Sequence, residues 1–173
     1  SHIEVIKLAK KAGFPAICIF EDDVIFCDDF RERIKYIEDQ NLNFDWLSLG
    51  GHFQKPEKKL IPNHDCATPT GVPYIYKSIH HGGTYAYIIT DRVYDFVIRN
   101  CNYNFGADEF YSTHVYPRFN CLAFVPFLCY SRDGVSDITG TAWVYENLKW
   151  FYQQESISGL IPQSFLLLYQ MAY

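Results

Sequence analysis

Apolar side chains recur on one face of a helix over residues 1–13. Ser1 and Glu4 form a capping box at the start of this helix, and Gly13 is a natural stop at its end. The pattern then changes to an unbroken apolar run, "AICIF" at 16–20. Because every position is apolar, we expect a strand buried on both faces, as in a parallel sheet.

The same alternation of patterns continues along the chain. Residues 52–79 break it, since they contain scattered prolines and no sustained period, and they are expected to form an excursion or active-site loop. The other predicted elements are helices at 28–39, 91–100 and 106–116, and strands at 45–51, 82–90 and 120–130. This order predicts an α/β fold with a mainly parallel central sheet flanked by helices.

Composition limits the fold and the partners. The chain has 173 residues, of which 49% are hydrophobic, which is enough for one domain with a core, so residues 1–173 are expected to form a single domain. A net charge of -5 with scattered cations argues against nucleic acid as a partner.

No apolar run is long enough to span a membrane. The tail at 158–173 contains a short apolar run, "FLLLY". Packing of this run on the domain is favoured over contact with a membrane surface, because no basic face accompanies it. We expect a cytoplasmic protein, with peripheral contact at the inner face of the membrane as the alternative.

Three acidic residues, Glu21, Asp22 and Asp23, follow the predicted strand at 16–20. Along extended backbone Glu21 and Asp23 point to one side and Asp22 to the other. Converging carboxylates raise each other's pKa unless a cation neutralises them, and Mg²⁺ or Mn²⁺ does so while keeping positions open for phosphate oxygens. The triplet therefore predicts a divalent metal site that binds a diphosphate at a sheet edge. A capped turn, or pairing with surface lysines, is the structural alternative.

A second acidic pair, Asp108 and Glu109, opens the short helix after Gly106. Transfer of a sugar to a hydroxyl with inversion needs a carboxylate that accepts the hydroxyl proton, and either acid suits this role. Asp108 is slightly favoured. The structural alternative is that both acids only stabilise the helix N-terminus.

The segment "HHGGTYAY" at 80–87 is a third candidate. Its glycines allow a ligand to approach the backbone closely, although on local sequence alone an ordinary turn before a strand is favoured. His80 and His81 are expected at the surface. His114 and Asp137 are available as further ligands, but a lone histidine and a Ser/Asp/Gly-rich turn are weak signals.

The combination is more specific than its parts. "SHIEVIKLAKKAGFPAICIFEDDVIF", "LSLGG" and "GGTYAYIITDRVYDFVI", followed by an acidic segment, resemble glycosyltransferase family 25. This family includes bacterial lipooligosaccharide galactosyltransferases, and the animal collagen galactosyltransferases have related domains. The resemblance covers roughly residues 1–30, 45–51 and 80–100, and loosely 104–138.

The resemblance implies a Rossmann-like GT-A fold that binds a nucleotide sugar. The metal motif of the family falls on residues 21–23, with Asp23 favoured as the direct metal ligand and Asp22 or Glu21 facing the ribose or sugar of the donor. Members of the family begin about one βαβ unit earlier, so the N-terminal βαβ part is expected to be missing here.

Two further site assignments follow from the resemblance. Gly83 and Thr84 would line the donor or acceptor cleft. His2 matches the end of a family motif and would face the donor, whereas Ser1 is explained as a helix cap.

The leading hypothesis is a metal-dependent, inverting glycosyltransferase that moves a hexose from UDP-galactose or UDP-glucose to a saccharide acceptor, in lipopolysaccharide or surface-glycan biosynthesis. Asp108 or Glu109 would be the base and Mn²⁺ or Mg²⁺ the cofactor. Two alternatives remain open, a metal-dependent phosphohydrolase and a non-catalytic remnant of the fold that binds carbohydrate or protein.

Overall fold

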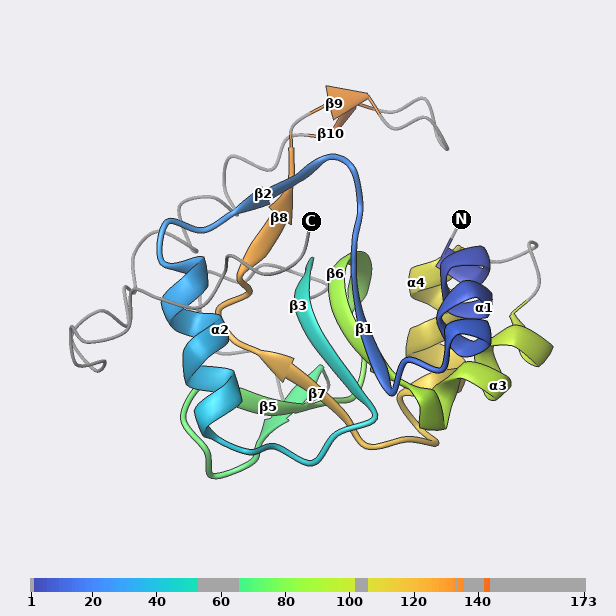
Figure 1. Cartoon of the computed structure of the whole chain (residues 1–173). Coiled ribbons are helices and arrows are strands. Elements are labelled where there is room, and N and C mark those ends of the chain that lie inside the picture. The colour runs from blue at the N-terminus through green and yellow to red at the C-terminus, as the bar shows by residue number, and fades with distance from the viewer. Residues whose placement is uncertain (1, 53–65, 102–105, 133, 136–141, 144–173) are drawn as a thin grey trace.

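The helices and strands of the chain form three layers, with the sheet in the middle. The computed structural model describes residues 2–52, 66–101, 106–132, 134–135 and 142–143. Figure 1 shows α2 on one side of the sheet and α1, α3 and α4 on the other. The helices are α1 (His2–Ala12), α2 (Phe30–Asp39), α3 (Asp91–Asn100), α4 (Ala107–Phe110) and the short π-helix η1 (Tyr111–Val115).

The main sheet has eight strands, which are mostly antiparallel. Its order is β1-β6-β3-β7-β5-β4, with β2 paired to β8 and β8 also paired to β3. The strands are β1 (Ala16–Phe20), β2 (Val24–Phe26), β3 (Trp46–His52), β4 (Ala67–Pro69), β5 (Ile75–Ser78), β6 (Gly82–Thr90), β7 (Cys121–Phe124) and β8 (Cys129–Ser131). β9 (Gly134–Val135) and β10 (Ala142–Trp143) form a separate antiparallel pair.

The α/β class is confirmed, but the mainly parallel sheet is not. Among the described strands only β3 pairs in parallel, with β7 and with β8, and the other pairs are antiparallel. The apolar runs indicated strands correctly, yet an apolar run carries no information about the direction of its neighbour.

Alternating side chains of β3 divide the core into two halves. Trp46 packs on the side of α1 and α3 with Tyr87 of β6, whereas Leu47 and Leu49 pack on the side of α2. Both halves are closed by helices whose apolar stripe faces the sheet, which is the layering that the sequence periods predict.

The expectation that β1 is buried on both faces is wrong. Within the described residues β1 pairs only with β6 and lies at the edge of the sheet. Ile19 is buried, but Ala16, Cys18 and Phe20 are exposed. An apolar run of five residues therefore predicted a strand but not its position in the sheet.

The predicted excursion at 52–79 contains regular structure in its described part. β4 and β5 form an antiparallel hairpin, which adds to β7. The predicted strand at 120–130 is two strands, β7 and β8, separated by a cis Val125–Pro126 bond. Ser1 and Asp137 lie outside the described residues.

Candidate active site

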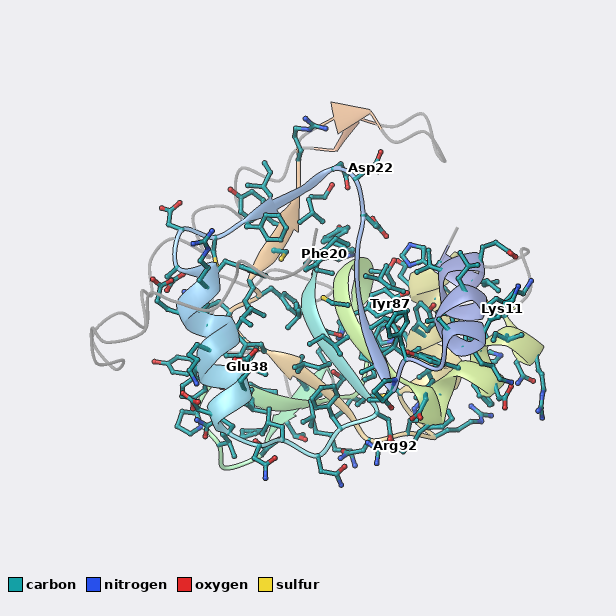
Figure 2. The ribbon with its side chains drawn as sticks, in the orientation of Figure 1. Lys11, Phe20, Asp22, Glu38, Tyr87 and Arg92 are labelled. Atoms are coloured by element: carbon teal, nitrogen blue, oxygen red, sulfur yellow. The ribbon has the colours of Figure 1, made fainter. Side chains whose placement is uncertain are left out.

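The acidic triplet lies at the turn between β1 and β2, and we call residues 21–23 the acid loop. The backbone N–H of Glu21 donates to the carbonyl of Tyr85 at 2.9 Å, so the pairing of β1 with β6 continues into the loop. Figure 2 shows Asp22 at the top of this turn, where its side chain is exposed. Glu21 and Asp23 are half-buried.

Glu21 joins two residues that the sequence placed in the site. The hydroxyl of Thr84 donates to Glu21 Oε1 at 2.7 Å, and His2 Nε2 lies 3.3 Å from the same oxygen. The other ring nitrogen of His2, Nδ1, lies 2.8 Å from the hydroxyl of Tyr87 in the core. The three side chains come from α1, the acid loop and β6, and they form one hydrogen-bonded group.

Asp23 is held by residues at the end of β8. Its Oδ2 accepts a hydrogen bond from the hydroxyl of Ser131 at 2.6 Å, and its carbonyl accepts from the N–H of Arg132 at 2.9 Å. In the part of the chain that the structure describes, neither Asp22 nor Asp23 pairs with a lysine or arginine. The structural alternative of a surface ion pair thus has no support among these residues.

Gly82 and Gly83, which we call the glycine turn, begin β6 beside the acid loop. Gly83 has φ +77°, a conformation that favours glycine. A Cβ on Gly82 would lie 2.6 Å from Nε2 of His52, so neither glycine leaves room for a side chain. The turn is therefore closely packed against the side chains of the protein itself.

Asp108 is connected to the glycine turn, whereas Glu109 is not. The N–H of Gly83 donates to Asp108 Oδ2 at 3.2 Å, and the N–H of Glu109 donates to Asp108 Oδ1 at 2.9 Å. Asp108 is half-buried and Glu109 is exposed. Through Gly83 and Thr84, the turn brings Asp108 and the acid loop to one place in the fold.

The prediction that His81 lies at the surface is wrong, because His81 is 1% exposed. Its Nε2 lies 2.9 Å from the hydroxyl of Ser48, which accepts a hydrogen bond from Trp46 Nε1. Burial lowers the pKa of His81 to about 3. The ring is therefore neutral at pH 7, and it packs in the interior next to the glycine turn. His80 is half-buried.

His52 was missed by the sequence reasoning. It ends β3, and its ring lies beside the glycine turn with Nδ1 3.0 Å from the hydroxyl of Tyr85. Burial lowers the pKa of His52, and the nearby Asp108 acts in the opposite direction. The signal in the sequence is a histidine directly after the two glycines at the end of a predicted strand.

Two tyrosines adjoin this group from the interior. Tyr85 and Tyr87 are buried, at 7% and 1% exposure, and their hydroxyls contact His52 and His2. His114 is half-buried on η1, and its Nδ1 contacts the hydroxyl of Thr113 at 2.6 Å. None of the described helices is both long and apolar enough to cross a bilayer.

A family model described as glycosyltransferase family 25 (LPS biosynthesis protein) matches residues 1–111. This match covers more than half of the chain, so the chain belongs to glycosyltransferase family 25. No curated protein matches the chain. The matched segment contains the predicted site residues from His2 to Glu109, but it ends before the further candidates His114 and Asp137 and before Ser131, which holds Asp23.

Proposed function

We propose that this chain is a metal-dependent, inverting glycosyltransferase that moves a hexose from UDP-galactose or UDP-glucose to a saccharide acceptor. The observation that carries the proposal is the pair of hydrogen bonds at the glycine turn, from Thr84 to Glu21 and from Gly83 to Asp108. They connect the acid loop to the proposed base, which is the arrangement that donor binding and acceptor activation require together.

The acid loop can supply part of the ligand set of a divalent ion. No group of three or more His, Cys, Asp or Glu side chains that could hold a metal ion is found among the described residues. Mg²⁺ and similar hard ions are commonly held by one or two carboxylates plus phosphate oxygens and water, and Asp23 supplies such a carboxylate. Asp23 is the proposed direct ligand. When bound, the ion would supply positive charge that stabilises the negative charge developing on the leaving UDP.

The residues of the chain divide the remaining tasks. Glu21, held by Thr84 and His2, has a fixed orientation from which it accepts hydrogen bonds from donor hydroxyl groups. Asp108 receives the proton of the acceptor hydroxyl. The Gly83 N–H of the glycine turn donates to Asp108, and the hydroxyl of the following Thr84 donates to Glu21, so this part of β6 lies next to both carboxylates.

Thermal shift with UDP-sugars, with and without Mn²⁺, tests the donor and metal parts of the proposal. We expect UDP-galactose or UDP-glucose to raise the melting temperature only with the metal. Asp23→Asn should abolish this shift and leave the unliganded melting temperature roughly unchanged, because the amide oxygen still accepts the hydrogen bond from Ser131. Asp28→Asn, at an exposed acid after β2, is the matched control and should retain the shift.

Two results would contradict the proposal. A normal metal-dependent shift in Asp23→Asn would remove the metal role of that residue. No shift of the wild-type chain with any UDP-sugar would remove the donor assignment. Release of inorganic phosphate from simple phosphate esters without an acceptor would favour a phosphohydrolase instead.

A further inference from the structure

The glycine turn is enclosed by two side chains, one from the end of β3 and one from β6. A Cβ on Gly83 would lie 2.8 Å from the ring of Tyr85 and 3.1 Å from Nδ1 of His52. A Cβ on Gly82 would lie 2.6 Å from Nε2 of His52. The ring of His52 therefore lies directly against both glycines, and the ring of Tyr85 lies directly against Gly83.

The two rings are also bonded to each other. His52 Nδ1 and the Tyr85 hydroxyl are 3.0 Å apart. Burial lowers the pKa of His52, so the neutral ring predominates at pH 7, and a neutral Nδ1 can accept the tyrosine proton. This hydrogen bond links the end of β3 to β6 at the level of the turn.

Glycine does not hold such a conformation by itself. Without a Cβ, Gly83 populates many backbone conformations, so its φ of +77° must be imposed by its surroundings. The contacts described above come from His52 and Tyr85 and are the closest to its Cβ position. The conformation of Gly83 matters because its N–H direction determines where Asp108 Oδ2 is held.

We propose that His52 and Tyr85 are positioning residues, which fix the glycine turn and through it hold Asp108 beside the acid loop. Neither residue is assigned a contact with substrate. The effect on sugar transfer rests on the proposed function, whereas the effect on the turn does not.

Amide hydrogen exchange measured by NMR tests the effect on the turn. In Tyr85→Phe, which removes one hydroxyl group, the Gly83 amide should exchange about five- to tenfold faster, which corresponds to the loss of one hydrogen bond. The amide of Ile88, further along β6, should be unchanged. His52→Ala should accelerate Gly83 exchange at least as much, and His52→Asn less, because its amide oxygen can still accept the tyrosine proton.

Tyr94→Phe is the matched control. The Tyr94 hydroxyl is buried and has no hydrogen-bond partner among the described residues. Its removal should therefore leave the exchange of Gly83 unchanged, which separates loss of the His52 bond from loss of any buried hydroxyl.

Steady-state kinetics test the consequence for transfer. Tyr85→Phe should lower kcat about tenfold while the KM for the UDP-sugar stays within about twofold, because the base is displaced but the acid loop is not. A purely structural role would lower stability without this separation of kcat from KM.

Unchanged Gly83 exchange in both Tyr85→Phe and His52→Ala would overturn the proposal. So would equal acceleration of Gly83 and Ile88, since that would indicate general loosening of β6. A wild-type chain that transfers no sugar would remove the proposed function, but the exchange experiment would still decide whether the two rings hold the turn.

Discussion

Asp108 and Glu109 are neighbours in sequence with different surroundings. Asp108 is half-buried and bonded to the backbone of the glycine turn, and Glu109 is exposed. A base must be held within reach of the hydroxyl group that it deprotonates, so a fixed carboxylate suits the role better than one free to rotate in solvent. The surroundings thus favour Asp108.

Asp108→Asn is expected to lower the rate of sugar transfer by about 10²- to 10⁴-fold, the usual contribution of a general base. Metal-dependent binding of the UDP-sugar should persist, because Asp108 does not belong to the acid loop. Glu109→Gln is the control and should keep most of the activity. A radiolabelled-donor assay with thermal shift in parallel measures both effects, and full turnover of Asp108→Asn would place the base elsewhere.

His81 makes the stability of the fold depend on pH. In the folded chain burial lowers its pKa to about 3, whereas a histidine in the unfolded chain has a pKa near 6.5. Between these values the unfolded state binds the additional proton, so stability decreases as the pH falls. Above pH 6.5 the ring is neutral in both states and contributes no pH dependence.

Urea unfolding at several pH values between 6.5 and 4 tests this effect. The free energy of unfolding should fall by up to about 1.4 kcal/mol per pH unit because of His81. His81→Asn has no titrating group at this position, so its pH dependence should be shallower by that amount. Identical slopes for the two proteins would mean that His81 is protonated in the folded state.

At the scale of elements, Gly50 of β3 faces the backbone of two neighbouring strands, β8 and β6. A Cβ on Gly50 would lie 2.9 Å from the carbonyl oxygen of Cys129 and 3.2 Å from the backbone nitrogen of Ala86. The pairing of β3 with β6 is irregular at the same place. Small residues are therefore needed on the central strand that leads to His52.

Gly50→Ala is expected to destabilise the fold by about 1–3 kcal/mol, the usual cost of overpacking, because the added methyl group meets backbone on two neighbouring strands. Gly134→Ala is the control, since no heavy atom of the described residues lies within 4 Å of its added Cβ. Chemical denaturation of both variants measures the difference. Equal stability of Gly50→Ala and wild type would show that β3 can shift at no cost.

Elements with a clear period were predicted well. The strand at 82–90 and the helix at 91–100 have the predicted bounds, because each combines a regular pattern with a start or stop signal. The hairpin of β4 and β5 was missed, since Pro69 and Gly71 interrupt a short and weakly periodic segment. Periodicity identifies an element only when the element is long enough to repeat.

At the scale of the whole molecule, sheet order and strand direction could not be predicted. These features depend on contacts between residues far apart in the chain, such as the antiparallel pairing of Phe20 with Ala86. Each part of the candidate site had its own local signal, and the fold supplied the connection between the parts. Ser131 was missed because a single serine has no such signal, and His52 was missed although it directly follows two glycines at the end of a predicted strand.

The position of β1 has a thermodynamic consequence. The acid loop follows β1, an edge strand that pairs, among the described strands, with β6 alone. The glycine turn begins β6. A ligand that contacts both segments ties the outermost strand to its neighbour. The binding free energy of this ligand is then added to the free energy needed to separate β1 from β6. Saturation with ligand therefore protects this edge of the sheet against local opening and proteolysis.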